Sequence, residues 1–229
     1  MTDAHCHLQD LKTFDVSGLK FVICAGASVD SSKKAIEIAQ KFSNVWATVG
    51  IHPESNDNIL EIKDLVGQPK VIAIGECGLD SDDPRELDLL KLHVELAREC
   101  DLPLVIHNRN QDKYILEILG HYQNVMMHCF TSDMNFMKEC VSRGWYISFG
   151  GILTFKKSEY LREIAKQVPE NLLLIETDSP YLAPEPYRGE KNHPKNVKIV
   201  AQLLANLRGT SINQIEEITD RNCQKLFNL

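Results

Sequence analysis

VIAIGE, at residues 71–76, places four apolar residues and one glycine directly before a carboxylate. The run is short, rich in branched apolar residues, and apolar on both faces, which is typical of a parallel strand covered by helices. Other runs along the chain share these properties. The pattern predicts eight strands, at residues 1–5, 21–25, 45–50, 71–75, 104–107, 125–128, 146–149 and 172–176.

Helix-like segments separate most of these runs. Between residues 84 and 100, for example, Leu87, Leu90 and Val94 fall on one face. Little room remains between residues 7 and 21, so the first connection is expected to be short or irregular. The expected helices are residues 31–42, 84–100, 110–119, 133–143, 158–166, 195–207 and 211–227.

Strands that alternate with helices over 229 residues predict one α/β domain, residues 1–229, folded as a (β/α)8 TIM-type barrel. An open, doubly wound sheet is the alternative. That fold more often carries a glycine-rich nucleotide loop, and the chain contains neither G-x-G-x-x-G nor G-x-x-x-x-G-K. The closed barrel is therefore the preferred interpretation.

The composition narrows the class of protein. Hydrophobic residues make up 43% of the chain, enough for one continuous core, and no apolar stretch approaches the roughly 20 residues that span a bilayer. No basic segment followed by an apolar one resembles a signal peptide. The seven cysteines form no C-x-x-C pair, so a cytoplasmic location is expected rather than a disulfide framework. Neither membrane association nor an obligate protein partner is expected.

Polar side chains end several of the apolar runs. His5 and His7 lie two residues apart, so both imidazoles point to the same side of the first strand. In a β/α barrel the C-terminal ends of all strands meet at one face, where catalytic groups gather. The polar residues at strand ends are His5, His7, His52, Glu76, His107, His128 and Asp178.

Six of these residues suit a metal centre at that face. Four imidazoles and two carboxylates are ligands for two divalent metal ions such as zinc, magnesium or manganese. Glu76, midway along the chain, is the natural bridge between two ions, and paired ions clamp the attacking and leaving oxygens of a phosphate ester. The predicted metal ligands are His5, His7, Glu76, His107, His128 and Asp178.

Other residues near the strand ends are candidates for supporting roles. His52, Arg109 and Arg188 are predicted to bind substrate, and the guanidinium of Arg109 could grip a phosphate. Asp3 and Glu176 share strand faces with predicted ligands, so each either orients an imidazole or is a buried carboxylate with a structural partner. Weaker candidates for substrate contact are Asn108, Tyr181 and Asn192.

Three cysteines adjoin predicted ligands, namely Cys6, Cys77 and Cys129. Neighbours on a strand point to opposite faces, so a residue beside an inward ligand faces outward. Small buried packing is the expected role of these cysteines, and metal binding or nucleophilic chemistry is the alternative.

The same strand ends carry motifs that run from the start of the chain to its end. The motifs are DAHCHL (3–8), VGIHP (49–53), IGECGLD (74–80), IHNR (106–109), HCFT (128–131), YISFGG (146–151), IETDSPYL (175–182) and PYRG (186–189). In content and order they resemble the TatD-like metal-dependent deoxyribonucleases, within the wider group of amidohydrolase-like barrels. The segments around Glu76 and Asp178 are the most specific.

The resemblance implies a metal-dependent hydrolase that cleaves phosphodiester bonds in DNA as a 3′–5′ exonuclease by a two-metal mechanism. The family's ligand positions fall on the six residues named above. Asp178 is then also expected to handle a proton of the attacking water, which makes Glu76 and Asp178 the expected catalytic residues. Residues after Asp80 and at Asn110 depart from the family pattern, and these positions lie at the expected substrate rim.

Two further hypotheses concern function. The same ligands activate water for attack on a carbonyl, so a metal-dependent hydrolase of a small ester, lactone or amide is the alternative. A barrel that retains metal for stability and serves as a non-catalytic binding module is the third. The expected substrate is accordingly DNA or a small phosphodiester or ester.

The charge and aromatic content limit how DNA could bind. The formal net charge of −7 argues against a broad basic surface, although bound metal ions add positive charge that this count omits. Aromatic residues make up only 7% of the chain, so an extended base-stacking platform is not expected. Any nucleotides would bind as a short segment near the metals.

Overall fold

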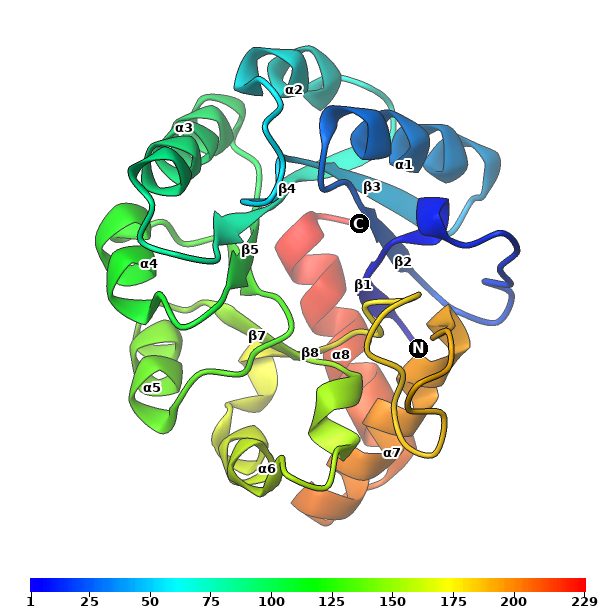
Figure 1. Cartoon of the computed structure of the whole chain (residues 1–229). Helices are drawn as coiled ribbons and strands as arrows, with labels where there is room; N and C mark the ends of the chain where they lie inside the picture. Colours follow the sequence, from blue (N-terminus) through cyan, green and yellow to red (C-terminus); the bar gives the residue numbers. More distant parts are fainter.

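The eight strands form one parallel sheet in which each strand pairs with the next along the chain. The computed structural model describes residues 1–229. Figure 1 shows the strands around a common centre with most of the helices outside them. The strands are β1 (Asp3–Cys6), β2 (Val22–Ala25), β3 (Val45–Val49), β4 (Val71–Leu79), β5 (Leu104–Asn108), β6 (Val125–Met127), β7 (Tyr146–Phe149) and β8 (Leu173–Ile175).

The helices alternate with these strands from β2 onward. The predicted (β/α)8 barrel is confirmed, and the open doubly wound sheet is wrong because the strand order never reverses. None of the helices is both long and apolar enough to cross a membrane. The helices are α1 (Val29–Lys41), α2 (Ile59–Val66), α3 (Pro84–Cys100), α4 (Asp112–Leu119), α5 (Met134–Ser142), α6 (Glu159–Gln167), α7 (Val197–Arg208) and α8 (Ile212–Phe227).

Two connections depart from regular, long helices. The first, after β1, contains only the single 3-10 turn η1 (Leu8–Asp10), as its length predicts. The second contains α2, which was not predicted from the sequence. This helix has only eight residues, so its apolar positions Ile59, Ile62 and Val66 span about two turns, which is too short for a helical repeat to stand out in the sequence.

The barrel closes between β1 and the segment that follows β8. The Asp178 N–H donates to the His5 carbonyl (2.9 Å), and the His7 N–H donates to the Ser179 carbonyl (2.6 Å). Buried Asp3 accepts hydrogen bonds from the Thr177 N–H (2.8 Å) and the Thr177 hydroxyl (2.6 Å). Of its two predicted roles, Asp3 therefore has the structural one, and it aligns Asp178 with His5 and His7.

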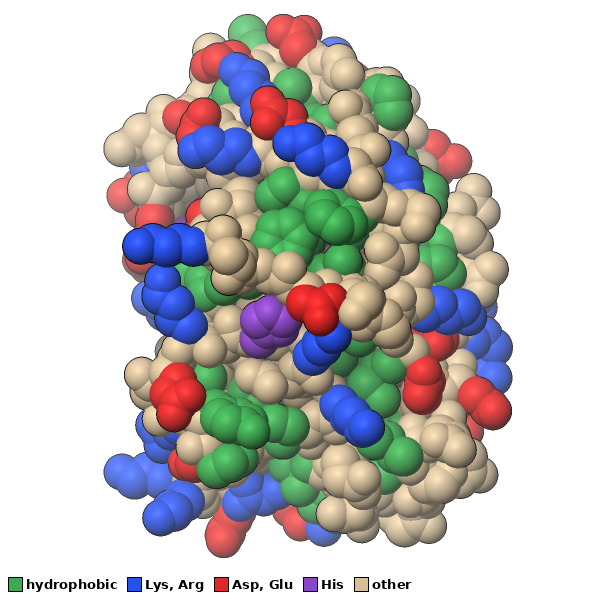
Figure 2. Space-filling view, turned by 90° about the vertical axis from the view of Figure 1, so that its right-hand side faces the viewer, with side chains coloured by type: hydrophobic (Ala, Val, Ile, Leu, Met, Phe, Trp, Pro, Cys, Tyr) green, Lys and Arg blue, Asp and Glu red, His purple; other side chains and the backbone are tan.

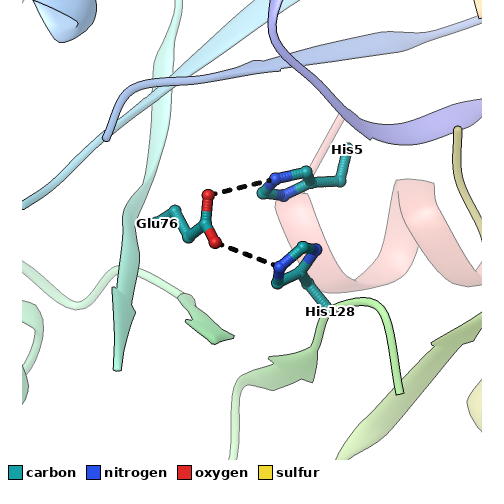
Figure 3. Close-up of side chains that lie close together, drawn as sticks. All are labelled: His5, Glu76 and His128. Carbon is teal, nitrogen blue, oxygen red and sulfur yellow. Dashed lines mark ion pairs between the residues drawn. The ribbon is translucent and has the colours of Figure 1, made fainter. Parts of the chain in front are cut away.

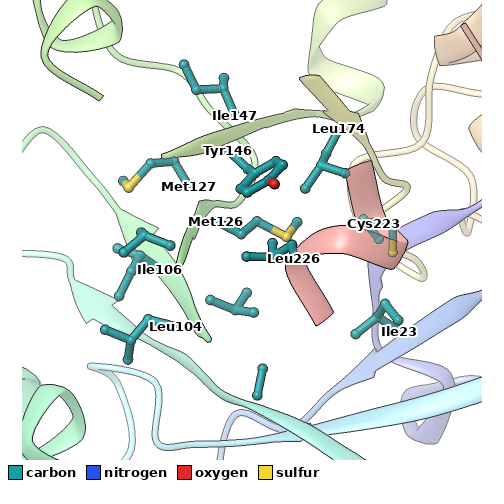
Figure 4. Packing of buried hydrophobic residues seen from close by; sticks show 14 of the residues in the cluster. Ile23, Leu104, Ile106, Met126, Met127, Tyr146, Ile147, Leu174, Cys223 and Leu226 are labelled. Atoms are coloured by element: carbon teal, nitrogen blue, oxygen red, sulfur yellow. The ribbon is translucent and has the colours of Figure 1, made fainter. Parts of the chain in front are cut away.

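Helix α8 covers the opposite, N-terminal end of the barrel. In Figure 1 it lies behind the strands, and Figure 4 shows its Cys223 and Leu226 among apolar side chains of the strands. Polar contacts fix it there, because Thr2 donates to Asp220 (2.7 Å) and Asn222 donates to the Leu173 carbonyl (2.8 Å). The predicted ligands lie at the other end of the barrel.

Strand β4 continues to Leu79 instead of ending at Gly75 as predicted. Gly78 explains how it can run so close to β5, because a Cβ at this position would lie 1.9 Å from the His107 carbonyl oxygen. The φ of Gly78 is +156°, which disfavours any other residue. The missing side chain thus lets β4 and β5 hold Glu76 and His107 side by side.

We expect Gly78→Ala to lower the free energy of unfolding by about 3 kcal/mol, because the new methyl group must push β4 and β5 apart. Gly67→Ala is the matched control. Gly67 has a φ of −80°, and a Cβ there would meet nothing within 4 Å, so its effect should stay below about 1 kcal/mol. Urea denaturation checks both values, and equal midpoints for the two variants would contradict the close approach of the strands.

Candidate metal centre

The six predicted ligands converge at the C-terminal end of the barrel. All of them are buried except His107, which is partly exposed. They come from five places around the barrel, because β1, β4, β5 and the segments after β6 and β8 all end at this face. The convergence follows from parallel strands that bring distant parts of the sequence to one opening.

Four donor atoms form a compact first set at the seam of the barrel, where β1 meets the segment that follows β8. His5 Nε2 lies 3.3 Å from His7 Nε2, 3.4 Å from Glu76 Oε2 and 3.7 Å from Asp178 Oδ1. His7 Nε2 lies 3.5 Å from the same Glu76 oxygen and 3.3 Å from Asp178 Oδ1. A tetrahedral ion with ligands at ~2.1 Å has donor atoms ~3.4 Å apart, so the spacing fits a cation such as zinc.

The other oxygen of Glu76 faces a second set of imidazoles. Glu76 Oε1 lies 3.0 Å from His128 Nε2 and 3.2 Å from His107 Nδ1. His52 Nε2 is 3.7 Å from the same oxygen, so His52 also belongs to this set by distance, although it was predicted only to bind substrate. Figure 3 shows the carboxylate of Glu76 facing the rings of His5 and His128, which stack on each other with their centres 4.0 Å apart, and one oxygen is directed at each ring. One carboxylate therefore contributes an oxygen to each set.

Charges within the cluster depend strongly on one another. Burial by itself raises the pKa of Glu76, but the imidazoles of His128, His107 and His5 hold it well below its ordinary value. Burial likewise opposes protonation of His7, yet its hydrogen bond and attraction to Asp178 raise the pKa of His7 to about 9. The buried carboxylates thus require positive charge beside them, which protons or divalent cations can supply.

Further contacts orient the imidazoles. Glu176 Oε1 accepts the Cys129 N–H (2.8 Å) and lies 3.1 Å from His128 Nδ1, which leaves Nε2 of that ring facing Glu76. On the other side of the second set, Asp80 Oδ1 lies 2.7 Å from His107 Nε2. Such carboxylates fix the tautomer and direction of an imidazole that binds metal.

Asp80 was not among the residues predicted for the site. The signal that could have found it is its spacing from Glu76, because residues 76 and 80 lie an even number of positions apart on one strand face. The apolar run predicts a strand that ends at Gly75, so Asp80 falls outside the predicted strand, whereas β4 continues to Leu79. Glu176, by contrast, was a predicted candidate, and its contact with His128 matches the orienting role.

The donor sets open into a cavity of about 650 Å³. His52, Arg109, Asn108 and Tyr181 line this cavity, and Arg109 Nε lies 3.3 Å from Asp80. Acidic Asp10 and Glu54, which were not predicted, also line it.

Two predicted substrate residues lie elsewhere. Arg188 does not line the cavity, and its guanidinium carbon lies 4.2 Å from the centre of the Phe155 ring. Asn192, in the loop that follows β8, is buried and donates hydrogen bonds to the Thr177 and Tyr181 carbonyls. Of the three cysteines beside predicted ligands, Cys129 lines the cavity, whereas Cys6 and Cys77 are completely buried.

The chain is similar to known proteins over nearly its whole length. The family described as TatD related DNase matches residues 2–228. The chain is 34% identical to the uncharacterized metal-dependent hydrolase YabD of Bacillus subtilis, over 91% of this chain and 87% of that protein. It is 31% identical to the uncharacterized metal-dependent hydrolase TatD of Mycobacterium tuberculosis, over 100% of this chain and 98% of that protein.

Solved structures show the same barrel. The crystal structure of YJJV, a TatD homolog from Escherichia coli, superposes with a TM-score of 0.91 at 25% identity, over 100% of this chain and 98% of that one. The lactonase Lmo2620 from Listeria monocytogenes shares the fold more distantly, with a TM-score of 0.66 at 16% identity over 99% and 94% of the two chains. Since the family match spans nearly the whole chain, this protein belongs to the TatD-related DNase family and is a metal-dependent hydrolase.

Proposed function

We propose that the protein is a deoxyribonuclease that removes nucleotides from the 3′ end of single-stranded DNA with two divalent cations. The observation that carries this proposal is the carboxylate of Glu76, whose two oxygens face different donor atoms: Oε2 faces His5 and His7, and Oε1 faces His128 and His107. A pair of cations a few ångströms apart suits in-line displacement at a phosphodiester, because it can neutralise both the attacking and the leaving oxygen.

Each donor set would hold one of the two cations. His5, His7, Asp178 and Glu76 Oε2 would hold one cation, and His107, His128 and Glu76 Oε1 would hold the other. Bound there, the cations would stabilise charge on the phosphate and lower the pKa of the attacking water. Imidazole and carboxylate ligands accept zinc, magnesium and manganese to different degrees.

The protein's own side chains then position the substrate and move protons. The Asp178 carboxylate lies at the edge of the first donor set, where it can accept a proton from the water that attacks the phosphate. The terminal nitrogens of Arg109 form no hydrogen bond within the chain, so they are free for two phosphate oxygens, while Asp80 holds its Nε. Arg109 is thus the proposed phosphate contact at the rim.

The surface supports binding of a short segment rather than a long duplex. Figure 2, a view of one side of the barrel, shows acidic and basic side chains interspersed around an apolar patch, without a broad basic field on that side. The net charge is −7, so local charge at the cavity must supply the attraction for phosphate. The seven cysteines are all free thiols, which supports a reducing, cytoplasmic location for this activity.

Acidic residues at the rim favour a second candidate function. Asp10 and Glu54 line the cavity and repel polyanionic substrates, whereas a small neutral ester, lactone or amide would not be repelled. The lactonase that shares the fold shows that this barrel accommodates such chemistry in another protein.

A timed digestion of end-labelled oligonucleotides, beside a panel of lactones, esters and amides, separates the candidates. With zinc, manganese or magnesium supplied in turn, we expect a 3′ label to be released as mononucleotide before a 5′ label shortens appreciably. Cleavage of only the small substrates would reject the nuclease in favour of the second candidate. Absence of turnover with every metal would reject both enzymatic candidates and favour a non-catalytic binding module.

We expect Glu76→Ala to lower metal-stimulated cleavage of single-stranded DNA by at least about a hundredfold, because both donor sets lose an oxygen. Glu117→Ala is the matched control, since Glu117 is exposed on α4 and forms no ion pair. Initial rates on a labelled oligonucleotide check the pair of variants, with circular dichroism to show that both are folded. Full activity in Glu76→Ala would contradict the shared carboxylate.

Cation binding should release protons. His7, with its pKa raised to about 9, is protonated at neutral pH and must become neutral to bind a metal ion. Apparent affinity should therefore rise with pH by about one order of magnitude per pH unit for each proton released, and the contribution of His7 should level off above pH 9. Calorimetry in buffers of different ionisation enthalpy counts the protons. His7→Ala should release fewer, and pH-independent binding by the unmodified protein would refute the assignment.

A further inference from the structure

Tyr181 is an exposed aromatic side chain beside the first donor set. It lines the cavity with about 51% of its surface accessible, and it is the only phenylalanine, tyrosine or tryptophan that does so. Its ring centre lies 5.7 Å from that of His7, with an angle of 67° between the ring planes. At least one broad face of the tyrosine ring is therefore not covered by His7.

Both ends of Tyr181 are fixed. Its N–H donates to the Asp178 carbonyl (2.8 Å), and its own carbonyl accepts from Asn192 Nδ2 (2.8 Å). Asn192 is almost completely buried and also donates to the Thr177 carbonyl (2.7 Å). At the far end of the ring, the hydroxyl donates to Asp10 Oδ2 (3.0 Å). The ring therefore lies exposed across the seam of the barrel, and its position is fixed before any ligand binds.

Charge beside the ring indicates which part of a substrate it faces. The Asp10 carboxylate at the hydroxyl disfavours a phosphate group there, whereas a neutral heterocycle is tolerated. Arg109 offers a phosphate contact elsewhere on the rim. Apolar Ile152 and Leu182 also line the cavity, so a flat ring that stacks on Tyr181 would have apolar neighbours.

We propose that Tyr181 is the stacking surface for the base of a nucleotide next to the scissile phosphate, and so selects substrates with a planar ring at that position. The inference rests on the proposed nuclease function and deepens it. Stacking of a base on one aromatic side chain changes affinity by about tenfold, and a preformed ring gains this without an ordering cost. A single such ring agrees with the low aromatic content of the chain.

Three single-stranded oligonucleotides test the proposal. One is intact, one lacks the base of the 3′-terminal nucleotide, and one lacks the base of the next nucleotide. For the unmodified protein we expect kcat/KM to fall about tenfold for one of the two abasic substrates. In Tyr181→Ala that penalty should disappear, because no ring remains to distinguish the substrates. Loss of packing alone would lower the rates for all three substrates equally.

Two further variants complete the design. Tyr181→Phe keeps the ring and should keep the penalty, which separates stacking from the hydrogen bond to Asp10. Tyr187→Ala is the matched control, because Tyr187 is about 44% exposed but does not line the cavity. An unchanged penalty in Tyr181→Ala, or no penalty in the unmodified protein, would overturn the stacking role while leaving the nuclease intact. Failure of the unmodified protein to cleave any of the three would overturn the nuclease proposal, and this inference with it.

Discussion

The site depends on how the barrel closes. Strand β8 is only three residues long, and the chain beyond it completes the ring by pairing residues 178 and 179 with β1. Asp3 stabilises this pairing from inside the barrel by accepting two hydrogen bonds from Thr177. Because the two paired segments carry the donor residues His7 and Asp178, the hydrogen bonds that close the barrel also set the distance between these two side chains.

Most of the fold could be predicted because parallel strands in a barrel are apolar on both faces. Eight runs of this kind, and the long amphipathic helices between them, stand out from the sequence alone. Helix α2 could not be found in this way, because its eight residues give only about two turns of apolar repeat, too few to distinguish a helix from a loop. The end of β4 was missed for a different reason. In a sequence, glycine usually indicates the end of a strand. Gly78 instead lets β4 continue, because the absence of a side chain allows β5 to approach closely.

The positions of the donor residues at strand ends indicated that they would converge, and the six do lie together. What the sequence could not give is how each side chain divides its contacts. Nothing in the order of residues indicates that Glu76 turns one oxygen to each set, or that His52 approaches the second set. The same holds for contacts across the seam, such as that of Tyr181 with Asp10, which join residues far apart in the chain. Arg188 shows the converse, since a basic residue in a matching motif stacks on Phe155 instead of reaching the cavity.

In the proposed two-cation centre, the shared carboxylate of Glu76 would have a thermodynamic consequence. Since its two oxygens serve different sets, filling one set changes the charge and orientation of a group that the other set also uses. The two positions cannot then behave as independent binding sites. By linkage, whatever factor the first cation imposes on the affinity for the second, the second imposes equally on the first. Occupancy of the centre would therefore respond to metal concentration cooperatively, with positive or negative sign according to whether fixing the carboxylate outweighs repulsion between the cations.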